Sequence, residues 1–554
     1  MKKRSSSREQ RSSNRRRSGN RTQRDHRKPK PPRRTKKPHA KPLQMIFLTE
    51  PLLEFGYGQK MVYPRDGLFL FGPSGDSRDV LAVRYGVIGT ADGVRRMASW
   101  ASKVSRFIPI PPPGRRSRQV EPQHVPFPGF SEAFHCQWPA APVCAIDEID
   151  SAEIDKVLRI ANRYEAIREA VDLYVSRLTK EHNRLENPPA FWFVVIPEIV
   201  YELGRPNSVV PKDEQIQGQV ELSAKRAKEL KTNPTLYGLE DEDAKVYEYA
   251  KHFRRQLKAR LLKDRIVTQI VRETTLVPED FLGPKGRPLR RVEDAASIAW
   301  KLGTGAFYKA GGKPWQLANV RDGVCYVGLV YKRSDLSTDP RHACCAAQMF
   351  LTDGDGVVFR GALGPWFHAD TRQFHLDKNA AKGLVEMVTD EYKSQHDNKG
   401  PSELFIHATS TFTDEEWNGF SEGAGSSTNL VGVQIKRANE ELKLFRPGEY
   451  PVIRGSALLT GERSAYLWTS GYAARLDTYM GPETPNPLLI RVVRGDCPLK
   501  TVLEDILGLT KINFNSCLHN DGVPVTIRFA NAVGDVLVSA PMSSEPRLPF
   551  KFYI

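Results

Sequence analysis

The order of the predicted elements indicates an α/β fold built from two successive parts. In the first part, helical and strand segments alternate along the chain, whereas the second part opens with three strands in succession. Alternation is typical of a parallel sheet with helices on both faces, and a run of strands before a helix is typical of a mixed sheet. At 554 residues the chain is too long for one ordinary core, so two or more domains are expected.

The first part has the pattern of a Rossmann-like, doubly wound sheet. The apolar run FWFVVIPEIVYEL (191–203) predicts a central parallel strand, and residues 151–182 have the apolar spacing of one long amphipathic helix. The alternation continues with a helix over 242–264, the strand RIVTQIV (265–271) and a helix over 292–312 that ends at a Gly pair.

Upstream of this pattern the predicted elements are shorter. QMIFLTEPLLEFG (44–56) and GLFLFGPSG (67–75) are expected to form short strands separated by turns, and VLAVRYGVIGT (80–90) a buried strand. The Pro-rich stretch 108–130 predicts a loop or an extended linker.

The second part begins as an RNase H-like sheet does. YVGLVYKRS (326–334), residues 343–353 and residues 356–363 predict three strands in meander order. A helix over 379–395 and the strand ELFIHATS (403–410) are expected to follow.

The positive charge of the chain is concentrated at its beginning. Residues 1–42 carry 18 Lys or Arg side chains and two acidic ones, which leaves about +1 of the total charge of +17 for the other 512 residues. This stretch is rich in Ser and Pro and has no apolar periodicity, so residues 1–43 are expected to form a disordered arm. The arm either binds nucleic-acid phosphates without sequence preference or serves as a solubilising tail, and both interpretations stay open.

Cysteine usage and hydropathy favour a cytoplasmic protein with no membrane partner. The seven cysteines form no CxxC pair, and an odd number without a signal peptide predicts reduced thiols. No stretch approaches the roughly 20 apolar residues of a membrane-spanning helix.

One helix and the strand after it carry residues suited to binding phosphate. Arg254 and Lys258 lie four apart, hence on one helical face, and Gln269 follows in the next strand. Taken alone, a solvated basic face is the better explanation of the two cations. Lys309 precedes the Gly311-Gly312 pair, but the GxxxxGK[ST] pattern of a nucleotide-binding loop is absent.

Several motifs in series resemble the MID and PIWI halves of Argonaute proteins. In order, they are TEPLLEFG, GLFLFGP, RRQLKAR…IVTQIVRETTL, YKAGGKPW, YVGLVYKR, ELFIHATSTFTDEEWNGF and LTKINFNS…PVTIRFANAVGDVL. The resemblance covers residues 44–554 and leaves no room for N and PAZ domains, so the chain is similar to a short prokaryotic Argonaute. It implies a strand and linker region of the MID half at 44–150, a MID domain at 151–315 and a PIWI domain at 316–554.

The resemblance implies a pocket for the 5′-phosphate of a guide strand. The family's pocket positions match Arg254, Lys258, Gln269 and Lys309, with Lys301 as the alternative to Lys309. Arg254 departs from the usual aromatic residue or His, which puts stacking on the first guide base in doubt.

In many members of the family a divalent ion is shared between the guide phosphates and the C-terminal carboxylate. Here that carboxylate belongs to Ile554. A Mg²⁺ ion at this position would neutralise phosphate repulsion rather than catalyse a reaction.

The resemblance also implies that this chain does not cut. An RNase H-like site holds two metal ions with several carboxylates, and the family's positions for them carry Val330, Thr409 and Asn531 here. Asp353, Asp355 and Asp414 lie nearby in sequence and are the ligands that a displaced metal site would use. As turn residues and a helix cap they also have a purely structural explanation.

The function implied is guide-directed recognition within a prokaryotic defence system against phage and plasmids. A short 5′-phosphorylated guide, expected to be RNA, would pair with a complementary target, expected to be single-stranded DNA with RNA as the alternative. The activity would reside in a partner effector chain, in which an APAZ region is fused to a TIR, sirtuin-like or nuclease domain. The alternative function is an active guide-directed endonuclease with displaced metal ligands.

Overall fold

The computed structural model describes residues 43–75, 80–112, 121–232, 239–319, 321–333, 343–350, 356–438, 442–479, 481, 483–541 and 547–554. From Leu43 onward the chain forms one compact unit. The predicted arm, apart from Leu43, lies outside the described residues, and so do Asp353 and Asp355.

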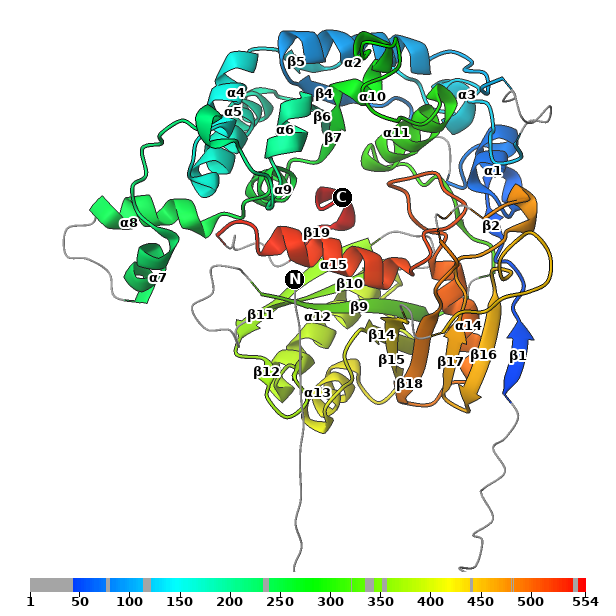
Figure 1. The fold of residues 1–554 in the computed structure, drawn as a ribbon. Coiled ribbons are helices and arrows are strands. Elements are labelled where there is room, and N and C mark those ends of the chain that lie inside the picture. Colours follow the sequence, from blue (N-terminus) through cyan, green and yellow to red (C-terminus); the bar gives the residue numbers. More distant parts are fainter. Residues whose placement is uncertain are drawn as a thin grey trace, which may run out of the picture. The chain divides into compact units, whose positions relative to one another are not determined.

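A four-stranded parallel sheet organises the first part of the chain (Figure 1). Its strands lie in the order β5 (Cys144–Ile146), β4 (Tyr85–Ile88), β6 (Phe191–Ile196) and β7 (Thr268–Arg272). All six residues of β6 are buried, as a strand covered on both faces requires. Phe193 and Val195 enter one core, whereas Trp192 and Val194 enter another on the opposite face.

Helices supply the other half of each of these two cores. On the face of Phe193 lie α2 (Ala91–Val104) and α11 (Ala295–Lys309), and on the face of Trp192 lie α4 (Ser151–Leu158), α5 (Arg163–Arg184) and α9 (Phe253–Leu261). Further helices of this part are α3 (Phe130–Phe134), α6 (Glu198–Leu203), α7 (Ala224–Thr232), α8 (Leu239–Ala244) and α10 (Glu273–Leu276). The predicted alternation of strands and helices is therefore present.

Four local predictions are wrong. The strand expected over 191–203 ends at Ile196, because Pro197 has no N–H for the ladder and is the N-cap of helix α6 (Glu198–Leu203). Residues 64–71, part of which was expected to be a strand, form helix α1 (Pro64–Phe71), because Pro64 favours the first helical position and Gly72 ends the helix at φ 71°. The helix predicted over 151–182 is two helices, with Asn162 capping the second by accepting from Tyr164 N at 3.1 Å. The helix predicted over 242–264 is likewise interrupted by a 3₁₀ turn.

A ten-stranded mixed sheet organises the second part. Its order is β1 (Gln44–Phe47), β16 (Ser456–Gly461), β17 (Ser464–Leu467), β18 (Leu488–Arg494), β15 (Asn429–Arg437), β14 (Glu403–Ala408), β9 (Val324–Lys332), β10 (Ala343–Phe350), β11 (Gly356–Gly364) and β19 (Arg547–Pro549). The predicted meander is present, since β10 pairs antiparallel with both β9 and β11. β14 and β15 then run parallel to β9.

Four helices cover the two faces of this sheet. On one face, α12 (Lys378–Gln395) and α13 (Asp414–Ala424) pack on Leu329 and Ala408. On the other, α14 (Leu499–Leu509) and α15 (Val525–Leu537) pack on Val330 and Ile435. Val330 therefore faces α15, and the side chains of β9 alternate between two cores.

The first strand of the chain does not join the first sheet. β1 pairs with β16 at the edge of the ten-stranded sheet, although residues 44–150 were grouped with the MID half. Sequence order alone does not reveal such a crossover, because edge pairing is a long-range contact. Short strands β2 (Leu53–Glu54), β3 (Lys60–Met61) and β8 (Gln316–Leu317) form a third sheet, and β12 (Phe367–His368) pairs with β13 (Gln373–Phe374).

Across the part of the chain that the structure describes, no helix has both the length and the apolar character needed to span a bilayer.

Candidate nucleic-acid interface

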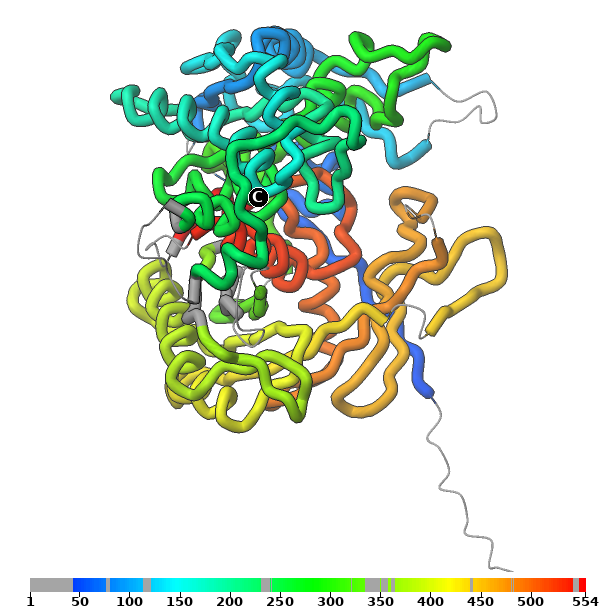
Figure 2. The backbone as a smooth tube through the Cα atoms, turned by 60° about the vertical axis from the view of Figure 1, so that its left-hand side comes forward, coloured from blue at the N-terminus to red at the C-terminus, as the bar shows by residue number. Residues whose placement is uncertain are grey.

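Helix α9, strand β7, helix α11 and the C-terminus converge on one pocket. Figure 2 shows the chain end between the helices of the four-stranded sheet and α15. The pocket has a volume of about 500 Å³. It is lined by Ile196, Val200, Tyr201, Gly204, Arg205, His252, Phe253, Arg254, Lys258, Gln269, Ile270, Val271, Arg272, Thr275, Leu302, Asn515 and Ile554.

Lys258 reaches the pocket from the buried face of α9. Its Nζ donates to Ile554 O at 2.5 Å, to Thr268 O at 3.0 Å and to Thr268 Oγ1 at 3.2 Å. Burial lowers the pKa of Lys258 well below its ordinary value, and the charges of Lys309 and Arg254 lower it further. Ile554 therefore accepts a hydrogen bond from a lysine whose burial disfavours its charged form.

Lys309 stands behind the pocket at the last turn of α11. Its Nζ donates to Gln269 Oε1 at 2.6 Å and to Asn515 Oδ1 at 3.1 Å, and its side chain is fully buried. Burial, together with the charge of Arg254, lowers the pKa of Lys309 to about 7. Both of these partners are amide oxygens rather than carboxylates, so an anion entering the pocket would meet incompletely neutralised positive charge.

The structure brings together four of the five side chains expected from the sequence. Arg254, Lys258 and Gln269 line the pocket, and Lys309 contacts it through Gln269. Lys301 lies elsewhere, because its Nζ pairs with Glu293 at 2.5 Å on a different surface. Of the two lysines considered, Lys309 is therefore the one at this site.

Sequence reasoning missed further polar residues of the pocket. Tyr201 contacts two guanidinium groups, with Arg272 3.6 Å and Arg205 4.1 Å from its ring centroid. Arg272 ends β7 and Tyr201 follows β6. The carboxyl ends of parallel strands are the usual ligand edge of a doubly wound sheet, and this signal could have found them.

His252 and Asn515 were also missed. His252 is the N-cap of α9, and its Nδ1 has no hydrogen-bond partner among the described residues. Burial lowers its pKa to about 4, so the ring is neutral at pH 7. A neutral imidazole and the amino end of α9 add to a pocket suited to an anion.

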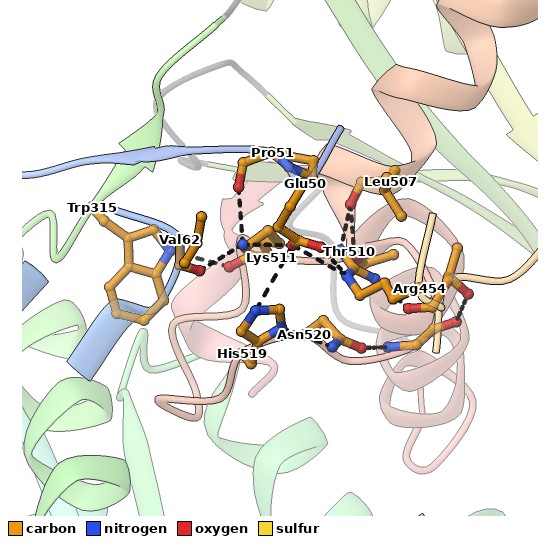
Figure 3. A network of polar contacts seen from close by, with 12 residues as sticks. Glu50, Pro51, Val62, Trp315, Arg454, Leu507, Thr510, Lys511, His519 and Asn520 are labelled. Carbon is orange, nitrogen blue, oxygen red and sulfur yellow. Dashed lines mark hydrogen bonds and ion pairs between the residues drawn. The ribbon is translucent and has the colours of Figure 1, made fainter. Parts of the chain in front are cut away.

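A buried polar network links Glu50 to Lys511 and Arg454 (Figure 3). Lys511 lies four residues before Asn515 in the loop that follows α14. Lys511 Nζ donates to Glu50 Oε1 at 2.7 Å, and Arg454 Nε donates to Glu50 Oε2 at 2.9 Å. Lys511 Nζ also donates to the carbonyls of Pro51 at 2.9 Å and Val62 at 2.6 Å.

The charges within this network set the pKa of Glu50. Burial favours the protonated acid, but Arg454 and Lys511 outweigh it and lower the pKa to about 2. Arg454 also donates to Thr510 Oγ1 at 2.8 Å, at the start of the loop. The network thus ties the loop to the segment that follows β1.

The three positions that would hold catalytic carboxylates lie around one end of the ten-stranded sheet. Val330 and Thr409 each follow directly after the paired residues Leu329 of β9 and Ala408 of β14. Asn531 is on α15, where its Nδ2 donates to Ile527 O at 2.9 Å. None of these side chains is a carboxylate.

Asp535 and Asp414 are each paired with cations. Asp535 of α15 pairs with Lys332 at 3.1 Å and with Arg255 at 2.7 Å. Asp414, one of the alternative ligands, pairs with Arg494. Among the described residues, no group of three or more His, Cys, Asp or Glu is placed to hold a metal ion.

His407 has a structural explanation in this surrounding. It is fully buried, and its Nδ1 lies 2.9 Å from Thr526 Oγ1 of α15. Burial lowers its pKa to about 3, so the ring stays neutral at ordinary pH.

Comparison with known proteins identifies the fold. No protein-family model and no curated protein matches the chain. Clostridium butyricum Argonaute bound to a guide DNA and a 19-mer target DNA matches with a TM-score of 0.53 and 15% identity, over 92% of this chain and 55% of that one. Aa-Ago with externally bound siRNA matches with a TM-score of 0.51 and 14% identity, over 92% and 56%. A further structure of A. aeolicus Argonaute matches with a TM-score of 0.51 and 13% identity, over 90% and 53%.

The chain spans about half the length of these Argonaute structures. At such low identity the likeness establishes the fold alone. The predicted fold class is confirmed: a Rossmann-like MID domain is followed by an RNase H-like PIWI domain.

Proposed function

We propose that this chain is an Argonaute of the short prokaryotic type that binds a 5′-phosphorylated guide and a complementary target and does not cleave the target itself. The observation that carries the proposal is the pocket, in which Arg254, Lys258 and Gln269 lie together with Lys309 behind them. These residues are spread over 56 positions of the sequence, from 254 to 309, and the fold gathers them at one site.

A phosphate monoester suits this pocket better than a neutral ligand does. Burial lowers the pKa values of two lysines here, and neighbouring positive charges lower them further. A phosphate dianion would supply an opposing negative charge, and amide groups of Gln269 and Asn515 could donate to its remaining oxygens. The guide is expected to be RNA and the target single-stranded DNA.

A magnesium ion fits the pocket only beside a bound phosphate. The carboxylate of Ile554 is the single anionic group among the lining residues, and it already accepts from Lys258. Mg²⁺ takes oxygen ligands and keeps several waters, so one carboxylate together with phosphate oxygens would satisfy it. We propose that Ile554 holds the ion and that the ion offsets repulsion between guide phosphates.

The absence of slicing is proposed from Val330, Thr409 and Asn531, which replace the carboxylates of a two-metal site. The activity would then belong to a partner effector with an APAZ region and a TIR, sirtuin-like or nuclease domain. This partner, a role in defence against phage and plasmids, and a cytoplasmic location are proposed from the sequence resemblance alone.

Binding of matched oligonucleotides tests the guide site. The full chain should bind a 5′-phosphorylated guide at least tenfold more tightly than its 5′-hydroxyl counterpart, since a charge-assisted hydrogen bond contributes roughly 1.5–3 kcal/mol. Lys258→Ala should remove most of this preference, and Gln269→Ala, which disturbs the core less, should reduce it. Lys500→Ala on the exposed face of α14 is the matched control and should change nothing.

Two results would overturn the proposal. One is a phosphate preference that disappears when residues 1–42 are deleted but survives Lys258→Ala. The other is cleavage of a complementary target by the purified chain with Mg²⁺ or Mn²⁺, which would favour the endonuclease alternative.

A further inference from the structure

The carboxyl ends of three parallel strands meet at one edge of the PIWI sheet. Leu329 of β9 is paired with Ala408 of β14, and Ala408 is paired with Gln434 of β15. The three strands are adjacent in the sheet, as Figure 1 shows. Residues that lie equally far beyond this row therefore lie side by side.

Two cations extend past this row on the face that α15 covers. Val330 of β9 and Ile435 of β15 pack in the same core as α15, and side chains two residues further on point to the same face. Those residues are Lys332 and Arg437. Because they are two strands apart, their backbones are separated by about 10 Å, given a spacing of about 4.8 Å between neighbouring strands.

Both cations are accessible to a ligand. Arg437 is exposed at the last position of β15. Lys332 is partly exposed, and its Nζ pairs with Asp535 Oδ1 at 3.1 Å. Asp535 is shared with Arg255, whose Nη2 lies 2.7 Å from Oδ2. Two cations therefore share one carboxylate, and Arg437 adds a third positive charge at the same edge of the sheet.

The side chains at this edge are positively charged, whereas the side chains that bind catalytic metal ions are negatively charged. Carboxylates gather metal ions, and metal ions in turn hold the phosphate to be cut. Here the row of Val330 and Thr409 has no carboxylate, and the residues just beyond it are cations that can contact phosphate directly. The nearby carboxylate, Asp535, is occupied by Lys332 and Arg255.

We propose that Lys332 and Arg437 bind the backbone phosphates of the target strand once it is paired with the guide. This edge would hold an uncut target in place of metal ions. The inference rests on the proposed function, because it assumes that a guide–target duplex enters the PIWI domain. It adds the residues that contact the target and predicts that they read charge rather than sequence.

Salt-dependent target binding tests the inference. Guide-loaded full-length protein is titrated with complementary DNA between 50 and 300 mM salt, using wild type, Lys332→Ala, Arg437→Ala and Arg437→Glu. Each neutralised cation should weaken target binding about 3- to 10-fold at low salt and lower the slope of log K against log [salt] by about 1. Arg437→Glu should have the largest effect, while guide affinity changes less than twofold.

Lys332→Ala removes one of the two partners of Asp535 and could therefore change the stability of the fold. Arg437 is exposed, so its variants test target binding without this effect. Lys500→Glu, which reverses a charge on α14 away from this edge, is the control for general electrostatics. Target affinity and salt slope unchanged in the Arg437 variants would overturn the inference, as would an equal loss in Lys500→Glu. If wild type fails to bind the guide at all, the proposed function fails first, and this inference fails with it.

Discussion

The phosphate pocket of the MID domain and the basic edge of the PIWI sheet both place cations where a nucleic acid would lie, but they hold them differently. Lys258 and Lys309 are buried and bonded to amide, hydroxyl and carbonyl oxygens and to the chain end. Lys332 and Arg437 stand at strand ends in partial or full contact with water.

This difference separates recognition of one chemical group from general attraction. A buried ammonium loses its hydration, so its charge is costly until an anion arrives, and the anion is then held strongly and at a fixed place. An exposed cation gives little energy, is screened by salt and accepts any phosphate. If nucleic acid binds as proposed, the pocket would discriminate a terminal phosphate, whereas the edge would only add affinity along a backbone.

The buried lysines can be held at fixed positions only if the surrounding structure is stable. Of the changes considered, replacing Glu50 should destabilise that structure most. Replacing Glu50 with Gln should lower the free energy of unfolding at pH 7 by about 2–3 kcal/mol, because its pKa is lowered from 4.5 to about 2 in the fold. Because the pKa of Glu50 is lower in the folded state than in the unfolded state, its charge stabilises the fold fully at pH values above 4.5. This stabilisation is lost as the pH falls from 4.5 through about 2. The difference between wild type and Glu50→Gln should therefore shrink to less than half at pH 3.

Urea unfolding of the two proteins at both pH values measures this effect. Glu504→Gln, which removes one member of an exposed pair with Lys500 on α14, is the control and should cost less than about 0.5 kcal/mol. Equal costs for Glu50→Gln at pH 7 and pH 3 would show that its charge does not support the loop of Asn515.

The pH dependence of guide binding sharpens the comparison from the side of the ligand. The pKa of Lys309 is about 7 in the free pocket, and a phosphate dianion would raise it by favouring the ammonium form. Binding then takes up a proton, so affinity for a phosphorylated guide should fall between pH 7 and pH 9, by at most about tenfold per pH unit.

A 5′-hydroxyl guide provides the reference, and its affinity should vary much less over the same range. Calorimetry in buffers of different ionisation enthalpy should detect the proton uptake directly. Binding of the phosphorylated guide with no proton exchange would mean that Lys309 does not meet the phosphate.

The smallest change in guide affinity is expected for substitution of Lys301. Comparing it with substitution of Lys309 tests which of the two lysines contacts the guide phosphate. Lys301 pairs with Glu293 away from the pocket, so Lys301→Ala should change the affinity for a phosphorylated guide less than twofold. Lys309→Ala should weaken it at least tenfold. A larger loss at Lys301 than at Lys309, in the same fluorescence titration, would reverse the assignment.

The sequence by itself determined the type of fold, because apolar periodicity reports which faces are buried. The apolar run 191–203 predicted a buried strand, which is present over 191–196, and the helix that ends before Gly311-Gly312 had apolar periodicity and a glycine stop signal. Lys258 and Gln269, which the sequence offered as phosphate ligands, line one pocket, and their proposed role stays a prediction.

The tertiary structure decided what depends on distant contacts. Short apolar stretches such as residues 67–71 fit a strand or a helix, and only packing chose the helix. The choice of Lys309 over Lys301, the entry of Tyr201 and Asn515 into the pocket, and the pairing of β1 with β16 all join segments far apart in the chain. Local periodicity carries no information on such contacts, because they form only when whole elements pack.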